Sequence, residues 1–277
     1  TAKELPYAEN LVNLLVADDL ARTGVAIAEV MRVLTPNGVA LIKRERIQKP
    51  WPPEMDDWGH PRHGADGNAA SRDELVGPPR RIRWVSGPWQ ESSNMATAGG
   101  RFYHAGLIAR DAFNGLRLWE RPLAPAPLRL GFTAASPAGS VLPVATRDRL
   151  FAVTDKRLAA LDPATGQTLL TYPKAGTPAW VLHDNGLLLA TARKEVRAVD
   201  AESGKLLWTA SGSEIEEPVA CEDGVFLLEG DVKRGEQRSV VCLDRATGRE
   251  RWRRSDYPWA ARARRLSCGK GLVIAEV

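Results

Sequence analysis

The feature that most constrains the fold of this chain is a short phrase that recurs four times with one spacing. An Asp is followed four residues later by Gly, and four residues after the Gly by a large apolar side chain. Asp accepts from backbone N–H groups two and three residues on and Gly tolerates positive φ, so the pair predicts a tight β-turn between two strands. The positions are Asp111, Gly115 and Trp119; Asp162, Gly166 and Leu170; Asp200, Gly204 and Trp208; and Asp244, Gly248 and Trp252.

The spacing of these phrases predicts stacked repeat units. They begin 51, 38 and 44 residues apart, a period that is typical of propeller blades. A second Gly-centred hairpin is marked by a Gly before an apolar run, at Gly100, Gly186, Gly224 and Gly271. Two hairpins make a four-stranded blade. We therefore predict a mainly β fold, an incomplete β-propeller of about four to five blades of four-stranded antiparallel sheet, with a small α/β segment at the N-terminus.

The large side chain that ends each phrase has a structural explanation. Trp119, Trp208 and Trp252 recur on one face of the predicted strands, and a ring of that size buries about 150–250 Å² when it packs. A repeat that cannot bury its own face must stack on its neighbour. We therefore expect these rings to dock between adjacent blades and to have no role in binding a cofactor.

Changes in composition divide the chain into three parts. Residues 1–49 are predicted to form an α/β unit, residues 50–78 a linker rich in Pro, Trp and His, and residues 79–277 the repeats. Pro50, Pro52 and Pro53 fix an extended path in the linker and exclude helix there.

The N-terminal part alternates between strand and helix signals. Residues 11–16 and 39–42 are apolar runs typical of buried strands, and residues 25–34 have apolar side chains at helical spacing. The sequence Thr-Pro-Asn-Gly at residues 35–38 is expected to break the chain between the helix and the second strand.

Charge and hydropathy limit the classes of partner. The formal charge is only +4 over 277 residues, and no apolar run reaches the ~20 residues that span a bilayer. Arg80, Arg81 and Arg83 lie around a strand predicted at Ile82 and Trp84, where they are expected to face water. We therefore expect neither a membrane span nor a nucleic-acid partner.

The linker holds the residues that most resemble a metal-ligand set. His60 and His63 are spaced as a His-x-x-His pair, with Asp66 nearby. Zinc needs such ligands in a fixed tetrahedral arrangement. The alternative is an ordered loop that packs Trp51 and Trp58 against the first blade. We favour the loop and assign no metal, with His60, His63 and Asp66 as the weak candidates for a metal site.

The three cysteines have no metal-site spacing and are odd in number. Cys221 and Cys268 occupy equivalent places in their repeats, three residues before Gly224 and Gly271. Free Cys behaves as a small hydrophobe in strands. These residues, with Cys242, are interpreted as buried strand residues rather than as a disulfide framework.

The repeats resemble a known family. Phrases from all four copies are similar to the PQQ-like, or quinoprotein-type, propeller repeat: LIARDAFNGLRLW, LAALDPATGQTLL, VRAVDAESGKLLW and VVCLDRATGRERW. The order of segments also resembles bacterial multidomain proteins of the planctomycete kind. The resemblance implies a bacterial protein, a protein or glycan partner and an extracytoplasmic, periplasmic location. PQQ dehydrogenases of the family use calcium and adjacent cysteines, and this sequence has no Cys–Cys pair.

A second resemblance concerns the N-terminal part. The runs LPYAENLVNLLVADD and AEVMRVLTPNGVALI are similar to the later strands of class I S-adenosylmethionine-dependent methyltransferases. The cofactor-binding strands of that family come earlier and are not in this sequence, and Asn13 stands where the family usually has Asp. The chain begins at Thr1 and ends inside a predicted blade. We therefore expect a fragment of a longer protein that carries a methyltransferase-like remnant.

These observations favour one function and leave two alternatives. The favoured function is a non-catalytic binding or scaffold module of a larger bacterial protein, with the rest of its parent chain as one partner. No catalytic or cofactor-binding residue is assigned, and no cofactor is expected. PQQ and S-adenosylmethionine enter only through the resemblances. The alternatives are part of a methyltransferase whose cofactor-binding half lies upstream, and a PQQ-dependent oxidoreductase.

Overall fold

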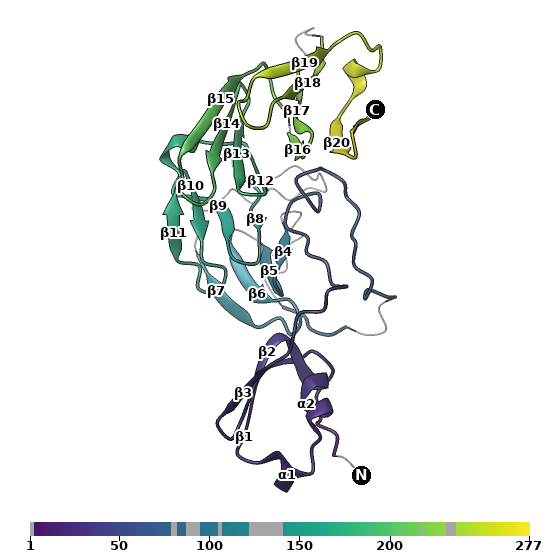
Figure 1. The fold of residues 1–277 in the computed structure, drawn as a ribbon, viewed down its shortest axis with the longest axis vertical. Coiled ribbons are helices and arrows are strands. Elements are labelled where there is room, and N and C mark those ends of the chain that lie inside the picture. The colour runs from purple at the N-terminus through teal and green to yellow at the C-terminus, as the bar shows by residue number, and fades with distance from the viewer. Residues whose placement is uncertain are drawn as a thin grey trace.

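An arc of β-sheets follows a small α/β unit, and an extended segment lies on the inner side of the arc (Figure 1). None of the helices in the described part of the chain has the length and apolar character that crossing a membrane requires. The computed structural model describes residues 3–78, 82–86, 95–104, 107–121, 141–216, 218–230 and 237–277.

The N-terminal unit is one short sheet with two helices. Its elements are β1 (Val12–Ala17), α1 (Leu20–Thr23), α2 (Ile27–Val33), β2 (Leu34–Ile42) and β3 (Glu45–Gln48). β1 runs parallel to β2, and β3 runs antiparallel to it. A helix packed on a parallel strand pair is the arrangement expected of an α/β unit.

The break expected between helix and strand lies inside β2 instead. Thr35–Gly38 belongs to the strand, which follows α2 directly. Between the pairs Val12–Leu34 and Leu14–Val39, β2 advances by five residues while β1 advances by two. The turn residues therefore form a bulge, with Asn37 at a φ of 65°, and pairing continues on both sides of it.

The described residues contain four sheets of four antiparallel strands, each in chain order. Blade 1 contains β4 (Ala96–Ala98), β5 (Arg101–His104), β6 (Ile108–Asp111) and β7 (Arg117–Glu120). Blade 2 contains β8 (Val144–Ala145), β9 (Leu150–Thr154), β10 (Arg157–Leu161) and β11 (Thr168–Thr171).

The later blades repeat this order. Blade 3 contains β12 (Trp180–Asp184), β13 (Leu187–Ala192), β14 (Glu195–Asp200) and β15 (Leu206–Ser211). Blade 4 contains β16 (Val219–Cys221), β17 (Gly224–Glu229), β18 (Ser239–Leu243) and β19 (Glu250–Arg254). A last hairpin contains β20 (Arg265–Gly269) and β21 (Leu272–Glu276). The short helices η1 (Pro173–Ala175) and η3 (Ala260–Arg262) lie between blades.

The sheets have the arrangement of a propeller. Neighbouring first strands contact one another, β4 with β8, β8 with β12, β12 with β16 and β16 with β20, so the first strands lie around a shared axis. Burial follows this order: β17 and β18 are buried along their whole length, whereas β19 is exposed along its whole length. The mainly β, propeller-like fold predicted from the repeats is confirmed.

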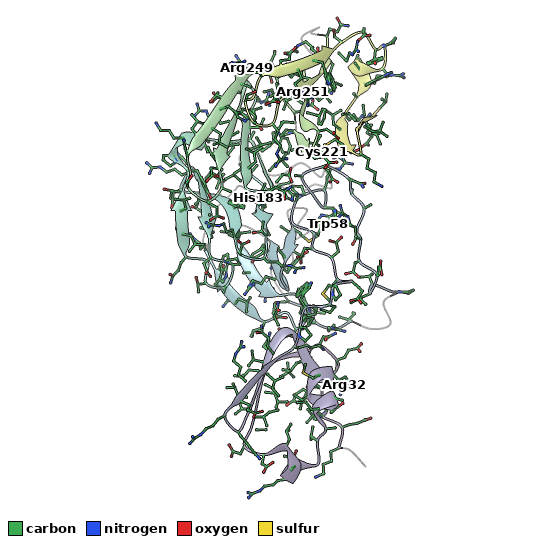
Figure 2. The ribbon with its side chains drawn as sticks, viewed as in Figure 1. Arg32, Trp58, His183, Cys221, Arg249 and Arg251 are labelled. Carbon is green, nitrogen blue, oxygen red and sulfur yellow. The ribbon has the colours of Figure 1, made fainter. Side chains whose placement is uncertain are left out.

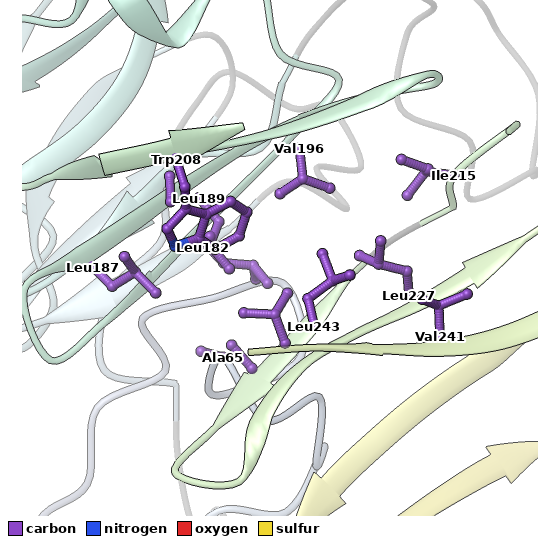
Figure 3. Packing of buried hydrophobic residues seen from close by; sticks show 13 residues of the cluster. Ala65, Leu182, Leu187, Leu189, Val196, Trp208, Ile215, Leu227, Val241 and Leu243 are labelled. Carbon is purple, nitrogen blue, oxygen red and sulfur yellow. The ribbon is translucent and has the colours of Figure 1, made fainter. Parts of the chain in front are cut away.

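Apolar clusters between neighbouring blades form the core. Leu227 and Leu189, each 1% exposed, belong to the cluster between blades 3 and 4 (Figure 3). Burial at this level is worth about 1.5–3 kcal/mol for each such side chain. The cluster therefore joins two sheets that share no strand pairing. Its labelled members are Ala65, Leu182, Leu187, Leu189, Val196, Trp208, Ile215, Leu227, Val241 and Leu243.

The Asp–Gly phrase forms the turn between the third and fourth strands of each blade. Asp162 Oδ1 accepts from the N–H groups of Ala164 (2.8 Å) and Thr165 (2.7 Å), and Gly166 N donates to Asp162 O. Gly166 has a φ of 72°, which is open to Gly at no steric cost. Hydrogen bonds within the turn hold the pKa of Asp162 below its ordinary value. Equivalent bonds and positive φ values occur at Asp111 with Gly115, Asp200 with Gly204, and Asp244 with Gly248.

The tryptophan of one blade docks on the turn of the next blade. Trp119 Nε1 donates to Pro163 O at 3.0 Å, and a Cβ on Gly166 would lie 2.7 Å from the Trp119 ring. The turn glycine therefore also provides the space that the ring occupies. Trp208 makes the same contacts with Arg245 O (2.9 Å) and Gly248.

Trp84 fills the same place on blade 1. Its Nε1 donates to Ala112 O at 3.1 Å and its ring covers Gly115. Residues 82–86 form no strand, contrary to the expectation from Ile82 and Trp84. Ile82 is 80% exposed and does not anchor the segment. The packing of Trp84 on blade 1 holds the segment in place, instead of the strand pairing that was predicted.

Blade 2 has Leu170 in place of tryptophan and makes the missing bond with another residue. Tyr172, two residues later, is fully buried and donates its hydroxyl to Ala201 O at 2.6 Å. Ala201 follows Asp200 as Pro163 follows Asp162, so the acceptor is equivalent. Burial raises the pKa of Tyr172 to about 12.

At the other end of the series, Trp252 is 38% exposed and packs on Phe226. Its ring lies on no Asp–Gly turn in the described part of the chain.

Replacing Tyr172 by Phe tests the Tyr172 bond. The substitution leaves Ala201 O buried without this donor, so we expect the free energy of unfolding to fall by about 1–3 kcal/mol in urea titrations. Tyr257→Phe is the matched control, because Tyr257 is 42% exposed, and it should have little effect. Equal stability of the two variants would contradict the assignment.

The N-terminal unit is attached to the turn of blade 1. Asn13 Nδ2 donates to Asp111 Oδ2 at 2.6 Å, and Asn114 Nδ2 donates to Leu11 O at 3.0 Å. Asp111 already accepts from the turn through its other oxygen. An Asp at position 13, as in the methyltransferase pattern, would place two carboxylates in contact and would be unfavourable. Asn13 can instead donate to Asp111.

Asn13→Asp should therefore destabilise the attachment at neutral pH by roughly 1–2 kcal/mol. The loss should shrink as the pH falls toward about 4 and below, because one of two carboxylates in contact takes up a proton more readily than a lone carboxylate and can then donate to the other. Hydrogen exchange of β1 measures the effect, and Asn13→Ala separates the lost donor from the added charge. A loss that does not depend on pH would contradict the carboxylate contact.

Candidate functional site

The linker supplies a hydrogen-bond acceptor to the first strand of every described blade. We call residues 58–66 the axial segment. Successive acceptors of this segment bind successive units, from β4 to β20, so one stretch of nine residues contacts five units. The bonds are Thr97 N to Trp58 O (2.8 Å), Ala145 N to Gly59 O (2.8 Å), His183 N to His60 Nε2 (3.2 Å), Ala220 N to Ala65 O (2.8 Å) and Cys268 N to Asp66 O (2.9 Å).

These bonds complete the inner edge of the propeller. A buried backbone donor without an acceptor costs about 1–3 kcal/mol. Four of the five acceptors are backbone carbonyls. Any residue can supply a carbonyl, so no residue pattern in the sequence marks these acceptors. Figure 2 shows Trp58 and His183 on the inner side of the arc. The axial segment thus occupies the side that faces the shared axis.

His60 is the one side chain among these acceptors. It is 7% exposed, and its Nε2 accepts from His183 N, so the proton of the neutral ring lies on Nδ1. Burial, together with the neighbouring His183, lowers the pKa of His60 to about 4. His183 in turn stacks on Phe151 at 5.0 Å between ring centroids.

The three candidate metal ligands each have another partner. His60 faces His183, His63 Nε2 lies 2.6 Å from Asp56 Oδ2, and Asp66 Oδ1 accepts from Asn68 N at 3.1 Å. Across the described ranges, no group of three His, Cys, Asp or Glu side chains is placed to hold a metal ion.

The two linker tryptophans pack beside the first blade. The Trp58 ring meets the His63 ring edge to face at 5.3 Å, and the Trp51 ring meets Phe113 of the blade 1 turn at 6.3 Å. Arg147 lies over the Trp51 ring at 5.0 Å, and its Nε donates to Asp57 Oδ2 at 2.9 Å. These contacts fix the start of the axial segment.

A second feature lies at the far end of the arc. We call residues 249–265, which include β19 and η3, the basic segment; Figure 2 labels its first members, Arg249 and Arg251. Arg253 pairs with Glu229 and Glu250, and Arg251 donates to Asp223 O. The Tyr257 and Trp259 rings stack at 4.9 Å with an interplanar angle of 14°. The exposed arginines are Arg249, Arg251, Arg253, Arg254, Arg262, Arg264 and Arg265.

Five of these arginines have side chains with no ion-pair or hydrogen-bond partner within the described residues: Arg249, Arg254, Arg262, Arg264 and Arg265. Arg249 and Arg254 lie at the two ends of β19, which in the described part of the chain pairs only with β18 and is the outermost strand of blade 4. Arg262, Arg264 and Arg265 lie between the end of η3 and the start of β20. Free backbone groups at a sheet edge can pair with an added strand. The arrangement thus combines a free strand edge, unpaired positive charge and an aromatic pair in which Tyr257 is exposed and Trp259 is half-buried.

Comparison with known proteins identifies the repeats. Residues 192–256 match the sequence profile of the family described as outer membrane protein assembly factor BamB. This stretch therefore carries a PQQ-like, BamB-type repeat. No curated protein sequence matches it significantly.

Solved structures similar to the chain include BamB and two quinohemoprotein alcohol dehydrogenases. BamB from Moraxella catarrhalis is 16% identical with a TM-score of 0.38, and the match covers 59% of this chain and 49% of that one. Quinohemoprotein alcohol dehydrogenase from Comamonas testosteroni is 16% identical with a TM-score of 0.45, and the match covers 60% of this chain and 35% of that one. Quinohemoprotein alcohol dehydrogenase ADHIIG from Pseudomonas putida HK5 is 15% identical with a TM-score of 0.44, and the match covers 65% of this chain and 37% of that one. The chain thus spans half or less of each of these structures.

The burial of His60 makes stability depend on pH. Because the folded-state pKa lies below the unfolded value of 6.5, the unfolded chain binds more protons between pH 6.5 and 4. The contribution of neutral His60 to the free energy of unfolding is complete above pH 6.5 and is lost as the pH falls toward 4. The loss is about 2 kcal/mol between pH 7 and 5. His60→Gln, which keeps an acceptor for His183 N, should lose that part of the pH dependence in urea titrations. An unchanged pH profile would contradict this assignment.

Proposed function

We propose that this chain is a non-catalytic propeller module that binds a protein partner through its basic segment. The exposed, unpaired arginines around the Tyr257–Trp259 pair carry the proposal. Guanidinium groups bind carboxylates through paired, charge-assisted hydrogen bonds, and aromatic rings and arginines are enriched at protein interfaces. The partner is therefore a protein with an extended acidic stretch that also carries apolar side chains.

The edge of β19 gives this partner a defined way to bind. An extended segment added beside β19 would use its backbone groups for pairing and would place alternate side chains next to the arginines. The free side chains of Arg249 and Arg254 lie at the two ends of the strand, so acidic residues at both ends of a short peptide would have charged partners.

The comparisons support a partner-binding role and an extracytoplasmic location. The matching family is described as an outer membrane assembly factor, and BamB is among the similar structures. We therefore extend the proposal to a partner outside the cytoplasm. In this proposal the chain is one module of a larger protein.

The two alternatives have less support from the residues. The quinone-dependent resemblance implies adjacent cysteines, which the sequence lacks, and the axial segment occupies the inner edge of the described blades. The matches cover only 35% and 37% of the two alcohol dehydrogenase structures. Nothing in the comparisons supports methyl transfer by residues 1–49, and Asn13 and Leu11 of that part bind blade 1.

Peptide binding tests the proposal. A fluorescent peptide of alternating Glu and Val residues should bind the chain, and a Gln and Val peptide should not, as measured by anisotropy at low salt. The triple variant Arg254→Glu, Arg262→Glu and Arg265→Glu should weaken binding by at least about 10-fold. Raising the salt should weaken binding to the unaltered chain as well.

A matched variant places the charge reversal elsewhere. Arg22→Glu with Arg44→Glu and Arg46→Glu changes three exposed arginines of the N-terminal unit and should leave binding unchanged. Equal loss in both variants, or equal affinity for the two peptides, would overturn the proposal. Binding to neutral oligosaccharides without binding to the acidic peptide would overturn it in favour of a glycan.

A further inference from the structure

The first strands of blade 4 and of the last hairpin are held side by side at one point. Ala220 N of β16 and Cys268 N of β20 donate to the carbonyls of Ala65 and Asp66 at 2.8 and 2.9 Å. These two acceptors belong to consecutive residues of the axial segment, so the donors are held about one residue apart. Cys221, the last residue of β16, follows Ala220 directly.

Cys221 and Cys268 share one apolar cluster between these strands. Cys268 is a buried member of the cluster that joins blade 4 to the last hairpin, and Cys221 packs against it. The neighbouring Cys221 is also among the groups that raise the pKa of the Cys268 thiol. Cys221 is visible on the inner side of the arc in Figure 2. The equivalent places that the two cysteines hold in their repeats thus become neighbouring places in space.

Asp223 fixes the ends of the two hairpins that carry the cysteines. Its Oδ2 accepts from Gly271 N at 3.0 Å and lies 3.8 Å from Cys221 Sγ. The turn after β16 is therefore bound to the turn after β20. With the two bonds to the axial segment, this contact limits how far the two thiols can separate, and a disulfide needs its Cα atoms about 4.4–6.8 Å apart.

We propose that Cys221 and Cys268 are a disulfide-forming pair that covalently joins blade 4 to the last hairpin in an oxidising compartment. The oxidant is a disulfide, either a small molecule or a thiol–disulfide oxidoreductase. The Cys221 thiolate attacks one sulfur of the oxidant and releases its first thiol. The Cys268 thiolate then attacks Cys221 Sγ and releases the second. The protein loses two protons and two electrons, and the oxidant gains them as two thiols.

Accessibility sets the order of these steps. Cys221 is partly exposed, whereas Cys268 and Cys242 are 7% and 2% exposed. Burial, and then the neighbouring Cys221, raises the pKa of the Cys268 thiol, and burial raises that of Cys242. The oxidant therefore reaches Cys221 first. Cys242 Sγ points toward Leu243 O instead and takes no part.

The test uses the full chain and its three thiols. Purified, reduced protein is incubated with oxidised glutathione under native conditions, and disulfide-linked peptides are mapped by mass spectrometry. We expect one intramolecular link between Cys221 and Cys268, retention of the Cys242 thiol, and a melting temperature that rises by several degrees and falls again with dithiothreitol. A stable glutathione adduct at Cys221, a link to Cys242 or three unreacted thiols would overturn the proposal.

Two variants separate the roles of the cysteines. Cys268→Ser should trap a glutathione adduct on Cys221, because the second attack has lost its nucleophile. Cys242→Ser is the matched control and should form the same disulfide as the unaltered chain. The peptide map of the unaltered chain decides the proposal even if either variant does not fold.

Discussion

The backbone hydrogen bonds of the axial segment are the constraint on which the rest of the structure depends. Each blade presents its first strand to the shared axis, and that strand needs an acceptor on its inner side. Trp58, Gly59, His60, Ala65 and Asp66 supply one acceptor to each unit in turn. The blades are thereby registered against a single stretch of chain as well as against one another.

The sequence predicts the parts of this fold that are decided locally. Asp162 and Gly166 lie in one turn, so their spacing is enough to place two strands. The role of Trp119 followed from its repetition. Trp84 and Tyr172 could not be assigned in this way, because neither has the spacing from an Asp–Gly pair that the repeat positions share. A search for an aromatic near Leu170 would have found Tyr172.

The same distinction applies to the candidate sites. His60, His63 and Asp66 look like ligands in the sequence because they are close together and of the right kind, but the fold gives each a separate partner. The proposed pairing of Cys221 with Cys268 depends on the stacking of two units. In the sequence, the only indication of this pairing is that the two cysteines hold equivalent positions in their repeats. The arginines of residues 249–265 are visible in the sequence, and the structure adds which of them are unpaired.

The position of the axial segment in the chain has a consequence for folding. Asp66 precedes its partner Cys268 by some 200 residues, and contacts so far apart in sequence form slowly because of the chain entropy that they cost. Each blade can pair its own strands as soon as it is synthesised. The inner edge is completed only after the last hairpin exists, so nascent blades would carry open edges until a segment made long before them is recruited.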